Sequence, residues 1–583
     1  MCSLTFTFLK TNINLHFCFM NLLVKPFIIF LTVTIFVPVI SIAQSSYVPL
    51  GSNSIYLLDR FEIKSGKLAE PTEFNSTSKL YKRASIAQYV DSFNVSRTAL
   101  SKQDYFNLDY LQNDNFEWSN SENTKSSKSI LSSKIYKHKA AFADYSSKEF
   151  NIVVNPITYQ QFGYDTRLKE MVSLQCSGIE VRGSLKGSVS FYTQITDEVI
   201  HTNSWVRDFY QKDSVIPGAG YLKSNDSKTF NYNLASGYIS FQASKHIDIQ
   251  FGHGKNFIGN GYRTFYLSDF STNHLFLRLN TRFWKINYTN IFGEILNYQQ
   301  PHEAYLPKWH YYAATHASIN LTKNFNLGLF QTIVFQRDSG YSNGSYDPQY
   351  LNPVIFYKPI ENGLNSPDKA ILGVDFKYNF LKHFSLYGQA VISEFILSEI
   401  IANNGSIANK QAYQLGIKCI DILDISTLDL QLEYNQANPY MYTSFNRLNS
   451  YINYNQNMAH PIGANLRELI GVLRYQPINR MTIKLTGIYT TYGNDTGQSN
   501  YGKNIALSYY NNTHEYGNFI GQGVLTHLYI FDLTVSHMLK HNLFLEFKAT
   551  YRKVSSVGGI FDSETFSPTL GVRWNIGERR WDF

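Results

Sequence analysis

The sequence predicts an all-β transmembrane barrel of about eighteen antiparallel strands, the kind that crosses an outer membrane, with a small helical segment before it. Three observations predict this fold: apolar and polar residues alternate over long stretches, the 583 residues include 43 Tyr and 42 Phe, and short connections alternate with long ones. A barrel needs this mixture because its wall faces lipid, its lumen is polar, and aromatic girdles mark both interfaces. The mean hydropathy of −0.24 argues against a bundle of apolar membrane helices.

The first 43 residues are predicted to be a signal peptide rather than part of the fold. Lys25 precedes an apolar run at 26–40, and a small-x-small cleavage site follows at 41–43. The run is too short to span a bilayer, which favours a cleavable leader that ends before Gln44. Met20 would begin a leader of ordinary length, so residues 1–19 are interpreted as a possible misassigned start.

Residues 44–148 are predicted to form a small, mainly helical subdomain in the periplasm. Apolar residues recur at helical spacing over 86–93, and Ser101 with Asp104 fits a capping box that starts a second helix. A stretch rich in Ser and Lys at 119–133 follows and is predicted to be a loop.

From residue 149 to 583 the pattern changes to a period of two, which predicts the barrel. The clearest strand covers 428–435, where Leu430 and Leu432 share one face with Leu428, and Asp429 and Glu433 share the other. Successive side chains of a strand point to opposite sides, so the leucines are expected to face lipid and the carboxylates the lumen. A soluble sandwich could alternate in the same way, so a single strand decides nothing.

The connections carry more information than the strands. Short polar turns such as Lys245-His246 and Lys540-His541 are predicted to alternate strictly with long loops. The long loops are expected near 199–227, 252–273, 337–368, 436–462 and 492–520. Outer-membrane barrels have short periplasmic turns and long extracellular loops, whereas a sandwich has no reason to gather its long loops at one end.

The end of the chain and its cysteines complete the barrel prediction. The last strand is expected to run to Trp581-Asp582-Phe583, a terminal aromatic that looks like the signal read by the outer-membrane assembly machinery. Cys176 and Cys419 are the two cysteines left after leader removal, and both lie on apolar faces of predicted strands. They are expected to be small buried or lipid-facing side chains, and a disulfide framework is excluded.

Three loop segments stand out as a set. Residues 252–263 read GHGKNFIGNGYR, residues 350–357 read YLNPVIFY, and residues 455–465 read NQNMAHPIGAN. Together they resemble the Wzi-like capsule-assembly family of outer-membrane proteins, and most closely its gliding-motility RemB branch in Bacteroidetes. The resemblance covers nearly all of the mature chain. It implies an eighteen-stranded barrel with a helical periplasmic extension that holds capsular polysaccharide at the cell surface or supports gliding.

Cationic and aromatic residues in the expected outer loops are the candidate glycan contacts. Lys255 and Arg263 could pair with uronate or phosphate groups of a glycan, or with lumen carboxylates such as Glu433. Aromatic faces suit sugar stacking because they combine an apolar plane with a polar edge, but loop packing or membrane-interface anchoring would use the same residues. The full set of candidates is Trp205, Arg207, Lys255, Tyr262, Arg263, Tyr357, Tyr440, Tyr442 and His460.

The sequence offers no support for catalysis. It contains no Gly-x-Ser-x-Gly elbow, no His-Glu-x-x-His motif and no paired cysteines, so no enzyme, cofactor or metal is expected. Lys255 lacks the Ser or Thr that follows the lysine of a phosphate loop, and no basic stripe suggests nucleic acid. The expected partners are surface or capsular polysaccharide, outer-membrane lipid, and gliding or secretion proteins. The alternative functions are a channel and a docking subunit of a motility or secretion complex.

Overall fold

The computed structural model describes most of the chain after the expected leader. Described are residues 44–583 except 71–72, 80, 96–99, 120–123, 125–134, 186–187, 223–227, 298–307, 338–343, 356–367, 395 and 498. The leader prediction for residues 1–43 and the candidate Tyr357 lie outside the described residues. None of the described helices has the length and apolar composition that a membrane crossing requires.

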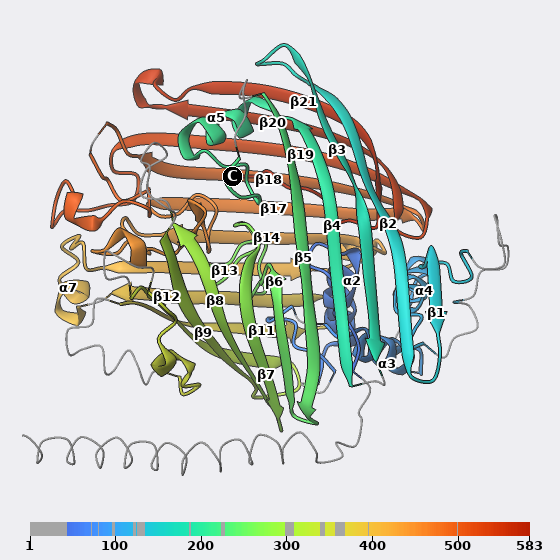
Figure 1. Ribbon diagram of the computed structural model, residues 1–583. Helices are drawn as coiled ribbons and strands as arrows, with labels where there is room; N and C mark the ends of the chain where they lie inside the picture. Colours follow the sequence, from blue (N-terminus) through green and yellow to red (C-terminus); the bar gives the residue numbers. More distant parts are fainter. Residues whose placement is uncertain are drawn as a thin grey trace, which may run out of the picture. The chain divides into compact units, whose positions relative to one another are not determined.

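Within the described residues, eighteen antiparallel strands form one closed barrel, which confirms the predicted fold class (Figure 1). Each strand pairs with the next in the chain, and the last closes on the first through the register Thr158↔Trp574 to Gly163↔Thr569. The strands are β2 (Phe150–Asp165), β3 (Glu170–Leu185), β4 (Val189–His201), β5 (Thr229–Ser244), β6 (Ile247–Gly254), β7 (His274–Phe283), β8 (Ile286–Asn297), β9 (Lys308–Asn320), β10 (Phe325–Phe335), β11 (Lys369–Phe380), β12 (Phe384–Glu394), β13 (Lys410–Cys419), β14 (Leu428–Ala437), β17 (Leu466–Ile478), β18 (Met481–Asn494), β19 (Val524–Lys540), β20 (Leu543–Ser556) and β21 (Ser563–Trp574). A short strand, β1 (Ala143–Ser146), pairs with the beginning of β2, beyond the closing seam.

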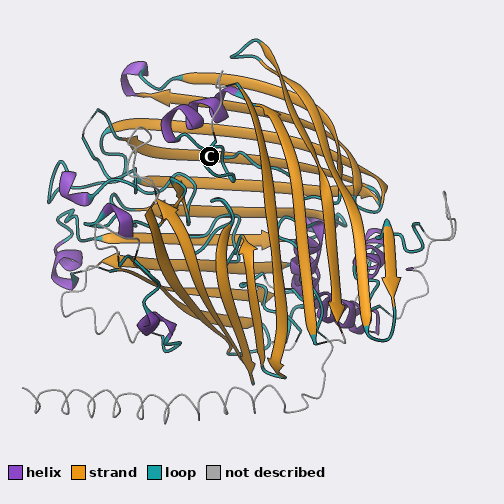
Figure 2. Cartoon of the chain, viewed as in Figure 1, coloured by secondary structure: helices purple, strands orange, loops and turns teal. Residues whose placement is uncertain are grey.

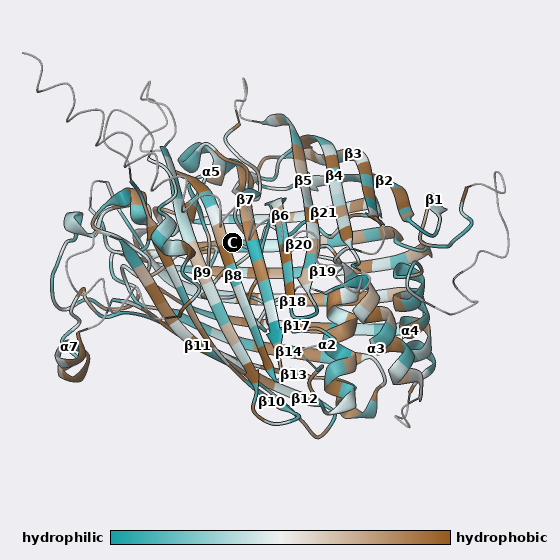
Figure 3. Cartoon of the chain, turned by 60° about the horizontal axis from the view of Figure 1, so that its bottom comes forward, coloured by the Kyte–Doolittle hydropathy of each residue, from teal (hydrophilic) through white to brown (hydrophobic). Residues whose placement is uncertain are grey.

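The alternation along β14 confirms the predicted register of the wall. Leu432 points outward with 48% of its surface exposed, whereas Glu433 and Asp429 point inward and are 2% and 5% exposed. A slip of one residue would exchange the two faces, so this contrast fixes the register. The same outward leucines and inward polar residues occur along β7 and β20. Figure 3 shows apolar and polar residues alternating along the strands.

The two ends of the barrel differ in their connections. We call the end where β2 begins and β21 ends the turn rim, and the opposite end the loop rim. Long connections gather at the loop rim, at 202–228, 255–273, 336–368, 395–409, 438–465 and 495–523. The prediction that short and long connections alternate strictly was wrong in two places, because the loop-rim connections 166–169 and 557–562 are also short. Asp165 closes the first of them by accepting hydrogen bonds from the backbone N–H groups of Arg167 and Leu168.

Three helices occupy the turn rim (Figure 2): α2 (Asn53–Ser65), α3 (Arg83–Val95) and α4 (Lys102–Asp114). The capping box of Ser101 and Asp104 starts α4 as predicted. The helices share one apolar core with Met538 and Phe544 of the wall. They are also tied to inward-facing wall residues by buried ion pairs, including Lys377–Asp59 at 2.6 Å. The helices therefore pack into the barrel end.

The last nine residues do not belong to the wall, and the prediction of a final strand ending at Phe583 was wrong. The strand β21 stops at Trp574, and residues 575–583 turn into the barrel, where Figure 1 marks the chain end. Residues 578–582 contain four charged side chains, Glu578, Arg579, Arg580 and Asp582, which fall on both alternating faces. Such a segment cannot present an apolar face to lipid, whereas a polar lumen accommodates its charges.

The two described cysteines are free and lie on opposite faces of the wall. Cys176 points into the barrel and packs against Trp205 and its neighbours. Cys419 pairs in register with the outward-facing Leu430 at the turn-rim end of β13. Both therefore act as small apolar side chains, as expected.

Candidate functional site

The candidate site is the interior of the barrel, where loop-rim segments and the C-terminal tail meet. The connection 255–273 folds inward and is anchored by Glu433 of β14. The Glu433 carboxylate accepts hydrogen bonds from the backbone N–H groups of Tyr262 and Arg263, at 2.6 and 3.0 Å. A Cβ at Gly261 would lie 2.5 Å from Glu433 Oε2 and 2.7 Å from the backbone carbonyl oxygen of Arg263, so this close approach requires glycine.

The Arg263 guanidinium is buried and belongs to an internal ion-pair network. It lies 3.3 Å from Asp582 of the tail and 3.5 Å from Glu468 of β17. Burial alone would lower the pKa of Arg263, but the Asp582 and Glu468 carboxylates more than offset this and raise it. His460, in the connection 438–465, binds the same Glu468 at 2.8 Å. The network therefore joins two loop-rim connections, the wall and the tail.

Lys255 is half-buried beside this network. Its Nζ donates to the backbone carbonyl of Asp269 at 3.0 Å. Burial lowers the pKa of Lys255 to about 8, and the nearby Asp269 carboxylate offsets only part of that effect. An ammonium group with little hydration and few partners gains more than an exposed one from a bound anionic group.

The tail, residues 575–583, crosses the interior from the turn rim towards the loop rim. Arg579 pairs with Glu198 of β4 at 2.7 Å, and Arg580 lies 3.6 Å from Asp269. The Phe583 ring packs against Phe209 and Phe270, with centroids 5.0 and 5.8 Å away. The sequence analysis did not predict that this segment lies in the lumen, although its run of positive and negative charges indicated a polar environment.

Most of the described candidate glycan contacts are buried. Trp205 and Arg207 lie on α5 (Ser204–Asp213) in the connection 202–228. Trp205 Nε1 donates to the backbone carbonyl of Trp581 at 3.2 Å, and Arg207 pairs with Glu170 at 2.9 Å. The Tyr262 hydroxyl donates to Asp582. The structure therefore brings Trp205, Tyr262, Arg263 and His460 together around the tail and its network.

Tyr440 and Tyr442 lie in the connection 438–465, and both rings are fully buried. The Tyr440 hydroxyl donates to the Asn500 carbonyl at 2.7 Å, and the Tyr442 hydroxyl donates to the Phe265 carbonyl at 2.6 Å. These rings fasten one connection to its neighbours, and neither face is open to a ligand. Their burial favours the loop-packing interpretation over sugar stacking.

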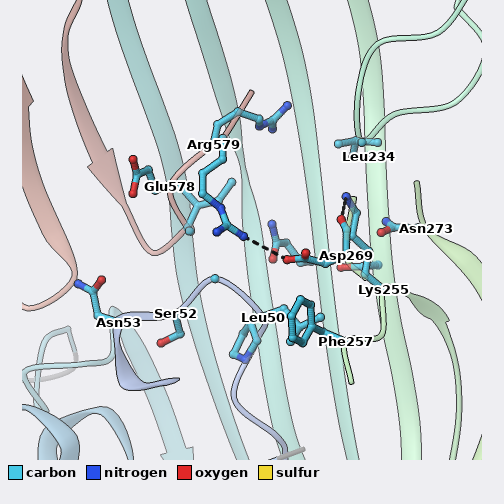
Figure 4. A pocket seen from close by; sticks show the side chains of 18 of the residues that line it. Leu50, Ser52, Asn53, Leu234, Lys255, Phe257, Asp269, Asn273, Glu578 and Arg579 are labelled. Carbon is cyan, nitrogen blue, oxygen red and sulfur yellow. Dashed lines mark hydrogen bonds and ion pairs between the residues drawn. The ribbon is translucent and has the colours of Figure 1, made fainter. Parts of the chain in front are cut away.

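A cavity of about 320 Å³ remains between the inward loop, the tail and the wall (Figure 4). Its wall side is formed by inward residues of β3, β4 and β5, and Lys255, Asp269, Glu578 and Arg579 line it opposite. A second cavity, of about 260 Å³, shares Glu578 and Arg580 with the first and continues towards α2 and β14. The tail thus divides the interior. Among the described residues, no group of three or more His, Cys, Asp or Glu side chains is arranged to hold a metal ion.

Comparisons with known proteins agree with the barrel. No family model matches the chain, and no curated protein matches it. Among solved structures, the chain is similar to Wzi of Escherichia coli, an outer-membrane protein involved in group 1 capsule assembly and described as a carbohydrate-binding β-barrel. The similarity has a TM-score of 0.55 and 11% identity, and covers 92% of this chain and all of that one. Pseudomonas aeruginosa OprD and OccK8 match at TM-scores of 0.41 with 10% and 11% identity; each match covers 73% of this chain, and 94% and 97% of theirs. The chain therefore has the fold of an outer-membrane β-barrel.

Proposed function

We propose that the chain is a non-enzymatic outer-membrane protein that binds or organises surface polysaccharide and thereby supports capsule attachment or gliding motility. The loop rim faces the outside of the cell, and the helices α2–α4 face the periplasm. The observation that carries the proposal is the occupied interior: helices, two inward connections and the tail fill a barrel that would otherwise be wide enough to conduct. Wide barrels conduct only when the lumen is left open.

Buried ion pairs hold the helices and the C-terminal tail inside the barrel. Arg60 of α2 pairs with Asp429 of the wall at 2.9 Å, and Lys82 pairs with Asp248 at 2.6 Å. Arg579 holds the tail to Glu198 of β4 at 2.7 Å. Breaking a buried pair by removing one partner typically costs 3–5 kcal/mol, so these segments do not leave the lumen readily.

The loop rim is the part of the molecule left for binding. The inward connections are cross-linked through Arg263, Glu468 and His460, so the outer surface above them is held in one arrangement. A preorganised surface loses less conformational entropy when a long flexible glycan binds. We propose that Lys255 is available to an anionic sugar that reaches the cavity, while the buried candidates Arg263 and His460 hold the connections beneath the binding surface.

Deletion and complementation test the proposal. We expect a strain that lacks the protein to retain less polysaccharide on its surface, or to spread less on agar, and the wild-type gene to restore both. The matched control is complementation with the empty vector, which should restore neither. Normal polysaccharide retention and normal spreading in the deletion strain would contradict the proposal.

A narrow channel is the second candidate function, and one observation favours it. The 320 Å³ cavity follows the inward face of β4 from Tyr192 to Glu198. At about 3.3 Å per residue this is about 20 Å of wall, a large part of a membrane crossing. The tail and the connection 255–273 close this path, so a solute could pass only if they moved.

A further inference from the structure

Three aromatic side chains lie together on the outer surface of the loop rim, and none of them is among the candidates named from the sequence. Phe445 belongs to the connection 438–465, and Tyr509 and Tyr510 belong to the connection 495–523. Phe445 is 52% exposed and Tyr510 66% exposed. The Phe445 and Tyr510 rings meet edge to face with centroids 4.2 Å apart, and the Tyr509 and Tyr510 rings are stacked at 5.7 Å. We call these three residues the aromatic platform.

Hydrogen bonds and a buried cation hold the platform in place. Ser508 Oγ donates to the backbone carbonyl of Phe445 at 2.8 Å, which joins the two connections. Ser508 also accepts from the backbone N–H of Tyr510 and so starts the short turn that presents both tyrosines. Beneath it, Lys410 Nζ lies 3.8 Å from the centroid of the Tyr509 ring. The rings are therefore positioned before any ligand arrives.

The platform belongs to the mouth of the barrel rather than to its lipid-facing wall. Lys410 is buried at the loop-rim end of β13 and pairs with Glu394 at 2.5 Å, and Glu394 also binds Lys369 at 2.5 Å. This charged cluster underlies Tyr509. Tyr442, three residues before Phe445, bonds to the inward loop at Phe265. An aromatic girdle that anchors a barrel in lipid would lie on the outer wall instead.

We propose that the aromatic platform is where the protein binds the sugar rings of a surface polysaccharide. The inference rests on the proposed function and names its contact site. An aromatic face offers an apolar plane to the C–H face of a pyranose, and the tyrosine hydroxyl can bond at its edge. Exposed clusters of large apolar side chains on a stable protein mark binding surfaces. The nearby Asn511 and His514 are exposed polar side chains that can bond sugar hydroxyls.

The test uses the full-length protein in detergent. The probe is polysaccharide extracted from the surface of the cells that naturally produce this protein. We expect Phe445→Ser/Tyr510→Ser to bind this polysaccharide at least tenfold more weakly than wild type, a difference of about 1.4 kcal/mol. The control is Phe561→Ser, since Phe561 is an exposed aromatic of the separate loop-rim connection 557–562. Phe445→Tyr/Tyr510→Phe keeps both rings and should retain binding. All variants should keep the heat-modifiable gel migration of a folded barrel.

The outcomes separate the site from the function. If wild type binds and the double serine variant binds equally well, the platform proposal is overturned while the proposed function stands. If wild type does not bind, both are overturned. If Phe561→Ser weakens binding as much as the double variant, the effect is not specific to the platform, and the proposal also fails.

Discussion

Replacing Arg579 by Gln tests whether the tail is seated in the lumen. Arg579 pairs at 2.7 Å with Glu198, whose side chain is 1% exposed, and Tyr232 donates to the same carboxylate at 2.9 Å. The substitution leaves a buried carboxylate without its cation. Removing one partner of a buried pair costs about 3–5 kcal/mol, and we expect the lower end because Tyr232 remains.

The assay is urea unfolding of the barrel refolded into lipid vesicles, followed by tryptophan fluorescence. The matched control is Arg167→Gln, because Arg167 pairs with Asp208 at 2.5 Å but both side chains are more than one-third exposed. An exposed pair contributes about 0–1 kcal/mol. Arg579→Gln/Glu198→Gln removes both charges and should regain most of the lost stability. Equal effects of the Arg579 and Arg167 substitutions, or no recovery in the double variant, would refute the seated tail.

Three other predictions follow from the wall, the inward loop and Lys255. Leu432→Arg places a charge in the middle of the lipid face of β14 and should lower the free energy of unfolding by about 2–4 kcal/mol. Its control, Gln431→Arg, points into the 260 Å³ cavity and should lower it less. Similar losses for the two variants in unfolding experiments would mean that the register is wrong. Gly261→Ala forces the new Cβ against Glu433 and should lower the free energy of unfolding by about 1–3 kcal/mol. Its control, Gly471→Ala, places the Cβ 3.6 Å from its nearest neighbour and should be nearly neutral. A neutral Gly261 variant would refute the close approach. Burial lowers the pKa of Lys255 to about 8 in the folded protein, so between about pH 8 and 10.4 the unfolded chain binds more protons than the folded one. The wild type should therefore become more stable relative to Lys255→Met as the pH rises through this range. Stability curves of the two proteins that run parallel would contradict this.

The wall could be predicted from the sequence because lipid and lumen act on each residue separately. In β14, outward Leu432 next to inward Glu433 is the direct consequence of a side-chain period of two. The helix start at Ser101 was predictable for a similar reason, since a capping box involves residues only three positions apart. Local rules of this kind need no knowledge of the partner across the barrel.

The interior could not be predicted in the same way, because it depends on contacts between distant parts of the chain. Arg263 and Asp582 are more than 300 positions apart, and nothing local to either indicates the other. Exposure in loops was also misjudged. Tyr442 was a plausible outer aromatic, but its connection folds inward and buries it, whereas Phe445, three residues later, stays exposed. The two aromatic residues belong to the same loop, and only the path of the backbone decides which of them is buried and which is exposed.

The occupied interior is the central claim, and conductance of the purified barrel in a planar lipid bilayer tests it most directly. We expect wild type to insert without stable open-channel currents, because the helices α2–α4, the inward connection 255–273 and the tail fill the lumen. As the positive control, a variant that lacks residues 44–114 and 576–583, and in which a short Gly-Ser turn replaces residues 256–272, should conduct once it has refolded into a heat-modifiable barrel. A steady, large single-channel conductance from the wild-type protein would contradict the account and favour a channel.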